Sequence, residues 1–460
     1  MTGLWRHQQA ALDFTLDHAA TYLHMGMGTG KSRVVIEALE RMAAQKVLIL
    51  CPKAAVRNVW PGQFEAWALR PWVVAAETKG TIARRMERMA QHSQRAAATG
   101  QPFAVVINYD AIRTEELERL IKRSAFEVVI FDEMHKLKSP TGKTAKAAQR
   151  IAYKIPRRIA LSGTPMPHSA MDVFAQFRVL NSEIFGTSFV SFRNRYAVMG
   201  GYEGREITGF KHMDDLTSRM AQITFQPEDV ELDLPPEMHE VRSIELGAKA
   251  MKAYTALERD FIAQVEDGGI IDPQNALVRL LRLQQMTSGI AVVEEVAGGE
   301  SYRKDVVIDE SKLQELRELF EDTGKEPIVV FGVFRHDMEV VRRAAYPEPI
   351  CELSGQADEL MEWKAGKARV LAVQIASGAE GIDLTRARYA VYLSTGFNLG
   401  SYLQSEKRVH RPGQTRPVTY YHLVAKDTID EKVYHALRER RNAVDAILAD
   451  IKKNRRRDNE

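Results

Sequence analysis

Short apolar runs alternate along this chain with longer stretches in which apolar positions recur at helical spacing. One series of runs lies at 47–51, 104–107, 128–131 and 159–161, and a second at 328–331, 370–373, 390–393 and 419–424. Continuous apolar runs of this length are typical of strands that are buried on both faces of a parallel sheet. Because helical patterns separate the runs, we predict an α/β fold with one parallel sheet in each half of the chain.

The stretch from about 165 to 326 interrupts this alternation and is predicted to be mainly helical, with helices at 250–265 and 273–286. Chain breakers lie at Gln226-Pro227 and Leu234-Pro235-Pro236. We therefore expect an N-terminal domain, residues 1–235, with a helical insertion after about 165. We expect a C-terminal domain, residues 236–460, with a helical insertion at about 247–326 and a basic tail. The tail, which includes 452–457, indicates a solvated end or a phosphate contact.

Composition places the chain among globular proteins. Of its 460 residues, 45% are apolar, and the formal net charge of +3 gives no sign of nucleic acid by itself. No run approaches the roughly 20 apolar residues that span a bilayer, and the first residues lack the apolar stretch of a signal peptide. Cys51 and Cys351 are the only cysteines, so neither a disulfide framework nor a cysteine-based metal site is expected. An intracellular protein, cytoplasmic or nucleoid-associated and without a membrane, is predicted.

A glycine-rich loop precedes a predicted helix near the N-terminus. Alternating glycines let backbone N–H groups approach phosphate closely, the lysine reaches the β- and γ-phosphates, and the serine hydroxyl can bind magnesium. The predicted site for ATP and Mg²⁺ comprises Gly26, Gly28, Thr29, Gly30, Lys31 and Ser32. The alternative is an ordinary glycine-rich turn before a helix.

Two adjacent carboxylates follow the apolar run 128–131. The carboxyl ends of parallel strands are where α/β sheets place their ligands. Asp132 is the predicted magnesium partner, and Glu133 the predicted base for the attacking water. A solvated acidic turn and a zinc site made by Asp132, Glu133 and His135 are the alternatives, although no further Cys or His cluster completes a zinc site.

These two motifs belong to a longer ordered set, and the whole set resembles superfamily-two helicase-like ATPases of the Swi/Snf branch. The matching segments are 4–8, 26–32, 50–52, 58–60, 132–135, 161–165, 180–186, 192–196, 229–230 with 234–236, 378–385, and 404–414. The chain departs from the family pattern at Met134, in its DEAH-like box, and at Pro412. The resemblance implies two RecA-like lobes in tandem with branch-specific helical insertions.

The resemblance also implies roles for further residues. Gln8 is expected to sense adenine, and Gly381 and Asp383 to sense the nucleotide. Residues Ser162, Gly163, Thr164 and Gln404 are expected to couple the nucleotide to the rest of the motor. Arg408 and Arg411 are expected to be arginine fingers from the second lobe; three residues apart, they would share one face of a helix.

The function that these observations favour is an ATP-dependent motor that translocates on double-stranded DNA. The alternatives are a strand-separating DNA or RNA helicase and a non-catalytic, ATP-gated scaffold. A monomer is expected, with a separate protein partner supplying targeting. Candidate contacts to nucleic-acid phosphates lie in loops after strands: Lys53, Arg57, Lys136 and Lys138. Trp60 and Trp67 are predicted to pack in the core or between lobes rather than to stack on bases.

Overall fold

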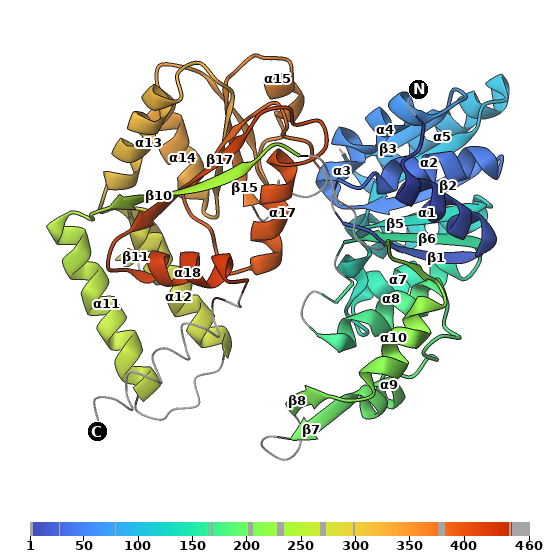
Figure 1. Cartoon of the computed structure of the whole chain (residues 1–460), viewed down its shortest axis with the longest axis horizontal. Helices are drawn as coiled ribbons and strands as arrows, with labels where there is room; N and C mark the ends of the chain where they lie inside the picture. Colours follow the sequence, from blue (N-terminus) through green and yellow to red (C-terminus); the bar gives the residue numbers. More distant parts are fainter. Residues whose placement is uncertain are drawn as a thin grey trace. The chain divides into compact units, whose positions relative to one another are not determined.

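The computed structural model describes residues 3–26, 28–78, 80–163, 165–166, 169–200, 206–227, 234–266, 273–297, 300–375, 382–440 and 443, without the side chains of 263–266, 273–275, 293–297 and 300–303. The chain divides into two compact units, Met1–Asp233 and Leu234–Glu460, called lobe 1 and lobe 2 (Figure 1). Each lobe is built on its own parallel sheet, which confirms the predicted fold class.

Lobe 1 contains a seven-stranded sheet in which every neighbouring pair is parallel. The strands in spatial order are β3 (Val73–Glu77), β4 (Phe103–Asn108), β2 (Lys46–Cys51), β5 (Val128–Asp132), β6 (Arg157–Ser162), β1 (Ala20–His24) and β9 (Thr224–Phe225). The N-terminal strand β1 therefore lies next to β6, far from it in sequence, as the crossover connections of a parallel sheet require.

Helices and short 3-10 turns connect the strands of lobe 1. They are α1 (Arg6–Asp17), α2 (Lys31–Arg41), α3 (Lys53–Asn58), α4 (Trp60–Trp67), α5 (Ile82–Thr99), η1 (Tyr109–Arg113), α6 (Glu115–Arg123), η2 (Met134–Leu137), α7 (Lys143–Ala152), η3 (Ala170–Asp172), α8 (Val173–Leu180), α9 (Phe189–Tyr196) and α10 (Met213–Ala221). A small hairpin, β7 (Ala197–Gly200) with β8 (Glu206–Phe210), follows α9.

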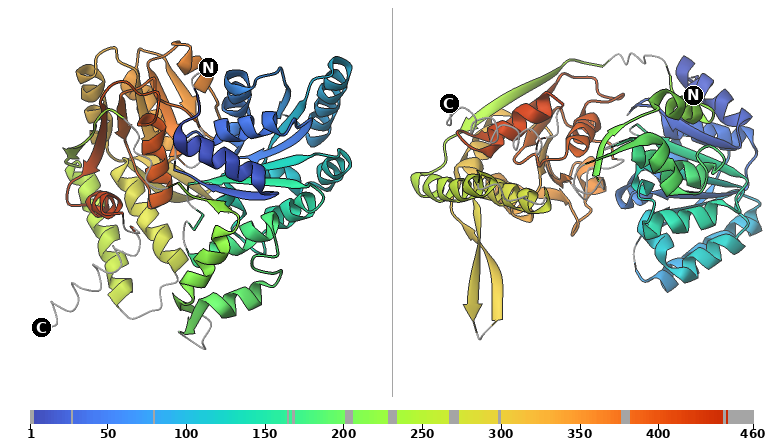
Figure 2. Two further views of the ribbon diagram at one scale, coloured as in Figure 1. Left: turned by 45° about the vertical axis from the view of Figure 1, so that its right-hand side comes forward. Right: turned by 90° about the horizontal axis from the view of Figure 1, so that it is seen from below.

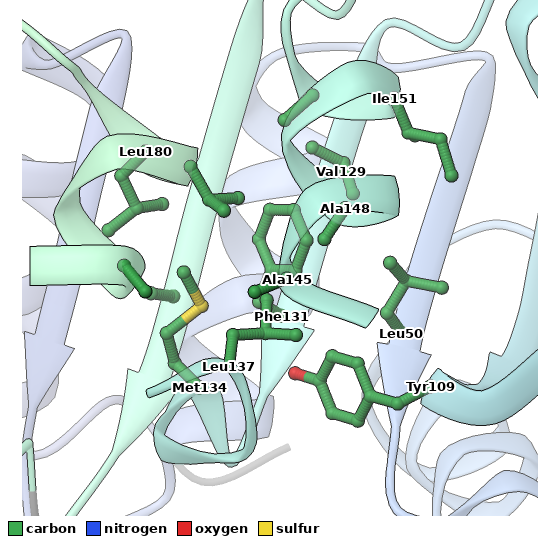
Figure 3. Packing of buried hydrophobic residues seen from close by; sticks show 14 of the residues in the cluster. Leu50, Tyr109, Val129, Phe131, Met134, Leu137, Ala145, Ala148, Ile151 and Leu180 are labelled. Atoms are coloured by element: carbon green, nitrogen blue, oxygen red, sulfur yellow. The ribbon is translucent and has the colours of Figure 1, made fainter. Parts of the chain in front are cut away.

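The core of lobe 1 lies on both faces of its sheet, because successive side chains of a strand point to opposite sides. Leu48 and Leu50 of β2 belong to one buried cluster, and Val47 and Ile49 to the other. Figure 3 shows the first face, where side chains of β5 and β2 meet the alanine-rich side of α7. Burial on both faces explains why these strands are continuous apolar runs.

Lobe 2 contains a six-stranded sheet that is also parallel throughout. Its strands in spatial order are β10 (Glu237–Ile244), β17 (Val418–Ala425), β16 (Tyr389–Tyr392), β13 (Ile328–Gly332), β15 (Val370–Gln374) and β14 (Ile350–Leu353). Its helices are α11 (Ala248–Glu266), α12 (Pro273–Thr287), α13 (Ser311–Asp322), α14 (Arg335–Ala345), α15 (Leu360–Lys364), α17 (Leu399–Val409) and α18 (Ile429–Arg438).

The predicted apolar runs coincide with β2, β4, β5, β6, β13, β15, β16 and β17, and the predicted insertion helices with α11 and α12. The expectation of a mainly helical region from about 165 to 326 was wrong at β9, at β10 and at two hairpins, β7–β8 and β11 (Ile290–Ala297) with β12 (Glu300–Val307). Figure 2 shows β11–β12 projecting from lobe 2. The edge strand β10 was missed because most of its residues are exposed and its apolar residues are separated by polar ones, so no apolar run marks it.

Across the part of the chain that the structure describes, no helix combines the length and the apolar character needed to cross a bilayer.

A buried ion pair joins the helical insertion of lobe 2 to its sheet. Lys312 Nζ of α13 lies 2.7 Å from Asp430 Oδ2 of α18 and also donates to the Leu393 carbonyl at 2.9 Å. The Thr287 hydroxyl at the end of α12 donates to Asp430 Oδ1 at 2.8 Å. Lys312 is only 3% exposed and Asp430 7%, so each charge depends on the other for its stability in a dry environment.

We expect Asp430→Asn to destabilise lobe 2 strongly. The substitution keeps the shape but leaves the Lys312 ammonium buried beside a neutral amide, a change that costs about 3–5 kcal/mol in comparable buried pairs. Chemical denaturation measures the free energy of unfolding, and hydrogen exchange assigns the loss to lobe 2. Asp110→Asn is the matched control, because the Asp110–Arg113 pair is exposed, at 77% and 48% of the side chains, and surface pairs contribute little. Equal effects of the two substitutions would contradict the expectation.

Candidate nucleotide-binding site

Three of the predicted motifs meet at one edge of the lobe 1 sheet. Strands β5, β6 and β1 are consecutive neighbours and run in the same direction. Their register pairs Asp132 with Leu161 and His24 with Ser162, so the three strands end level with each other. The acidic turn follows β5, the serine-glycine turn follows β6, and the glycine-rich loop follows β1. Segments that are about 30 to 130 residues apart in the sequence therefore share one ligand edge.

The glycine-rich loop has the backbone that its glycines permit. Gly28 and Gly30 have φ angles of 77° and 85°, in the left-handed region that disfavours residues with a Cβ. Helix α2 begins at Lys31, whose Nζ donates to the carbonyls of Met25 and Gly26, both at 2.8 Å. The lysine thus lies across the loop, and the helix N-terminus adds a partial positive charge for an anion.

Gln8 of α1 packs directly on this loop. Its Nε2 donates to the Thr29 carbonyl at 3.0 Å, and its Oε1 accepts from the Trp5 backbone N–H at 3.0 Å. The His7 ring also lies 2.9 Å from the Thr29 carbonyl. The structure therefore places the predicted adenine-sensing glutamine, only 2% exposed, beside the phosphate loop. Its contact with adenine stays a prediction.

Two hydrogen bonds hold Asp132 at the end of β5. The indole Nε1 of Trp60 lies 3.1 Å from its carboxylate Oδ2, and the Tyr109 hydroxyl donates to its main-chain carbonyl at 2.7 Å. Burial, and next the negative charge of Asp132, raise the pKa of Tyr109 well above its usual value, so this hydroxyl remains a donor. These donor roles were not predicted from the sequence. A tryptophan or tyrosine in a core usually directs its polar atom to a partner, which is the signal that was available.

Glu133 has an unusual backbone conformation. Its φ and ψ angles are 52° and 54°, in the left-handed region that a residue with a side chain seldom adopts. The side chain is buried, and Glu133 Oε2 lies 3.4 Å from His135 Nδ1. Backbone strain of this kind persists where the surroundings fix it, and it is frequent at functional sites.

His135 connects the acidic turn to the next strand end. Its Nδ1 also lies 3.2 Å from the Ser162 hydroxyl, the last residue of β6, which is fully buried. A continuous polar contact thus runs from Glu133 through His135 to Ser162. Gly163 follows directly in the sequence, whereas Thr164 lies outside the described residues.

The oxygen atoms at this edge suit magnesium better than zinc. Ser32 and Asp132 offer hard oxygen donors, and magnesium usually takes one or two protein ligands together with phosphate oxygens. Within the described residues, no group of three or more His, Cys, Asp or Glu side chains could hold a metal ion by itself. The donor set therefore fits a magnesium ion that arrives with a nucleotide, and it does not support the zinc alternative.

The predicted site residues of lobe 2 gather around α17. Gln404 and Arg408 are buried residues of this helix, and the Arg411 guanidinium donates to the Ile382 carbonyl at 3.1 Å. Burial alone would raise the pKa of Asp383, but hydrogen bonds from Thr385 and the charge of Arg411 lower it below its usual value. Asp383 and Arg411 are thus close enough to interact. Gly381 lies outside the described residues.

The expectation that Arg408 and Arg411 share one helix face was wrong. Helix α17 ends at Val409, so Arg408 is helical and Arg411 lies beyond the end. Pro412 is the physical reason, because a proline disfavours the helical conformation of the residue before it. The left-handed Gly413, with φ 105°, completes the turn.

The predicted phosphate contacts of lobe 1 extend from two neighbouring strands. Lys53 and Arg57 are exposed on α3, which follows β2, and Lys136 is exposed in η2, which follows β5. Lys138, just after η2, is half-buried, and this burial lowers its pKa. The structure therefore brings the four residues to the same edge of the sheet. Their contact with nucleic acid stays a prediction, and the basic tail at 452–457 lies outside the described residues.

Two family profiles match the sequence. The profile described as SNF2-related domain matches residues 7–289, and the profile described as helicase conserved C-terminal domain matches residues 311–413. The first alone spans more than half of the 460 residues. Together they include the glycine-rich loop, the acidic turn and both arginines of lobe 2.

Curated relatives align over most of the chain at low identity. Protein p41 of Acyrthosiphon pisum secondary endosymbiont phage 1 is 26% identical over 97% of this chain and 98% of its own length. A Caenorhabditis elegans homologue of SWI/SNF-related matrix-associated actin-dependent regulator of chromatin subfamily A-like protein 1 is 24% identical over 95% of this chain and 61% of its own length. Chromatin structure-remodeling complex subunit snf21 of Schizosaccharomyces pombe is 23% identical, and this chain covers 36% of its length. The chain thus spans only part of the two chromatin-related relatives.

Among solved structures, the SWI2/SNF2 ATPase core of Sulfolobus solfataricus in complex with double-stranded DNA matches with 19% identity and a TM-score of 0.43. The match covers 95% of this chain and 91% of that chain. Family membership therefore depends on the sequence profiles.

We expect Gly30→Ala to destabilise lobe 1 and weaken nucleotide binding, whereas Gly26→Ala should leave the stability of lobe 1 nearly unchanged. At Gly30 an L residue would be strained by about 1–2 kcal/mol in the left-handed region, and its Cβ would overlap the Gln8 amide. At Gly26 the nearest atom to an added Cβ is 3.6 Å away, an ordinary contact. Thermal denaturation without nucleotide, and titration with a fluorescent ATP analogue, compare the two variants. If the Gly30→Ala protein were as stable as the Gly26→Ala protein, the close packing of the Gln8 amide on the loop would be disproved.

Proposed function

This chain belongs to the SNF2-related family of helicase-like ATPases, and from that premise we propose that it hydrolyses ATP to translocate along double-stranded DNA. The observation that carries the proposal is the level alignment of three strand ends, which groups Lys31, Asp132, Glu133 and Ser162 at one edge of lobe 1. Phosphoryl transfer needs such a set, because catalysis consists of positioning and charge stabilisation.

We assign the ATP site to the loop from Gly26 to Ser32, with Lys31 as the phosphate-binding cation. Nucleotide would draw the Lys31 ammonium from the carbonyls of Met25 and Gly26 to the β- and γ-phosphates. Ser32 and Asp132 would hold the magnesium ion that accompanies the nucleotide. This ion supplies positive charge to the phosphate oxygens when it is bound.

Glu133 is the proposed general base. Its strained backbone and its contact with His135 fix the carboxylate near the strand ends, where it would orient the attacking water and accept its proton. The contact of His135 with Ser162 would make the turn after β6 sensitive to the state of the acidic turn. We therefore keep Ser162, Gly163 and Thr164 as coupling residues, with Gln404 in lobe 2.

The two lobes would act together. We propose that Arg408 and Arg411 deliver positive charge to the γ-phosphate from lobe 2, so that ATP favours a closed arrangement and its hydrolysis reopens it. Because Arg411 lies outside α17, the two arginines would approach from a helix and from the turn that follows it. Alternating grip on the DNA backbone by the two lobes would convert closure into movement along the duplex.

Glu133→Gln is expected to retain ATP affinity and to lower kcat by about 10²–10⁴-fold, because the amide keeps the shape of the side chain but cannot accept the proton. Binding of a fluorescent ATP analogue and steady-state phosphate release measure the two properties separately. Glu127→Gln is the matched control: Glu127 precedes the other end of β5, where its carboxylate accepts from the Gln45 N–H. Wild-type turnover in Glu133→Gln would disprove the assignment of the base.

Double-stranded DNA is expected to stimulate ATP turnover more than single-stranded DNA or RNA. The four basic residues after β2 and β5 would contact phosphates, so salt should weaken this stimulation steeply. Phosphate release with no polymer and with each polymer, at several salt concentrations, tests the expectation. Stimulation by single strands together with strand displacement on forked DNA would favour the helicase alternative. Tight ATP binding without turnover would favour the scaffold alternative.

The monomeric state, the targeting partner and the intracellular, nucleoid-associated location remain predictions. The chain covers 61% and 36% of the lengths of the two chromatin-related relatives.

A further inference from the structure

One buried side chain, assigned by sequence to packing alone, contacts the carboxylate proposed for magnesium. Trp60 begins α4, 72 residues before Asp132, and its ring is fully buried. Its Nε1 nevertheless lies 3.1 Å from Asp132 Oδ2. An indole has a single donor and no acceptor, so this contact is a hydrogen bond from tryptophan to carboxylate.

The surroundings of Trp60 leave its ring little freedom. It belongs to the buried cluster on one face of the lobe 1 sheet and packs against Phe64, with ring centroids 6.4 Å apart. Helix α4 packs against α2, the helix that begins at Lys31. At the other end of α4, the Arg33 guanidinium of α2 lies 4.4 Å from the centre of the Trp67 ring. The indole donor is therefore carried by a helix that is fixed to the phosphate loop.

Both the main chain and the side chain of Asp132 are thus restrained. The Tyr109 hydroxyl fixes the main-chain carbonyl, and the Trp60 indole fixes one carboxylate oxygen. A carboxylate that must bind a cation benefits from such outer contacts, because they set its orientation before the cation arrives. The indole donor restricts rotation of the carboxylate, so less of the binding free energy has to be spent on ordering it.

We infer that Trp60 is a positioning residue, which orients the Asp132 carboxylate for the divalent cation that accompanies the nucleotide. The inference rests on the proposed ATPase function and extends it to the first residue of α4. It predicts a defect in the use of the cation, separate from any defect in nucleotide binding or folding.

The test is Trp60→Phe, which keeps an aromatic ring and removes the donor. Affinity for a non-hydrolysable ATP analogue is measured by calorimetry at a series of Mg²⁺ concentrations and in EDTA. We expect the Mg²⁺ concentration that gives half of the affinity gain to rise about 10–100-fold, as for other outer contacts to metal ligands. Affinity in EDTA should equal that of the wild type. The Mg²⁺ dependence of turnover should shift in parallel.

Trp72→Phe is the matched control. The Trp72 Nε1 also donates to a carboxylate in lobe 1, Glu40 Oε1, at 2.7 Å, but Glu40 lies near the far end of α2. This variant loses the same kind of hydrogen bond away from the strand ends, so its Mg²⁺ dependence should match the wild type.

If Trp60→Phe has the wild-type Mg²⁺ dependence, the inference is wrong. Equal losses of affinity with Mg²⁺ and in EDTA would also overturn it, since they indicate a purely structural role. Should the variant not fold, benzothienylalanine at position 60 replaces the indole N–H by sulfur in a ring of the same size and gives the same comparison. A wild-type protein that binds nucleotide with Mg²⁺ but does not hydrolyse it would refute the ATPase proposal and leave this binding test intact.

Discussion

The parallel register of three neighbouring strands is the constraint on which the candidate site depends. Strands β5, β6 and β1 end level with each other, because Asp132 pairs with Leu161 and His24 pairs with Ser162. A strand displaced by one residue would point its side chains to the opposite face, so burial on both faces of the sheet fixes this register. Packing in the core therefore determines which side chains meet at the carboxyl ends of these strands.

Buried polar groups in the site are held by specific partners, and these partners come from distant segments. Trp60 and Tyr109 both form hydrogen bonds with Asp132. The Gln8 amide donates to the Thr29 carbonyl of the glycine-rich loop, and the His135 ring contacts the Ser162 hydroxyl. A buried polar group that lacks a partner costs free energy, so each contact favours one arrangement over the others. The strained backbone of Glu133 is compatible with this picture, since rigid surroundings are what allow strain to persist.

In lobe 2, too, a buried polar group is held by specific partners. Its sheet is also parallel, and Lys312 of α13 and Thr287 of α12 both bind Asp430, which fixes the helical insertion to α18. The proposed arginines lie at and just after the end of α17, where Asp383 interacts with Arg411.

The sequence by itself determined the two parallel sheets, since strands buried on both faces must be apolar runs, and it identified the loop and the acidic pair by their chemistry. It missed the edge strand β10, most of whose residues are exposed, and both hairpins, and it extended α17 past Val409 to Arg411. Only the tertiary structure decided which side chains support the motifs. In the pattern of apolar and polar positions, Trp60 counts only as an apolar core residue. Its proposed role depends on its indole N–H, which the packing of the lobe directs at Asp132. Periodicity records which face of an element is buried, whereas the contact of one polar atom depends on how segments far apart in the chain come together.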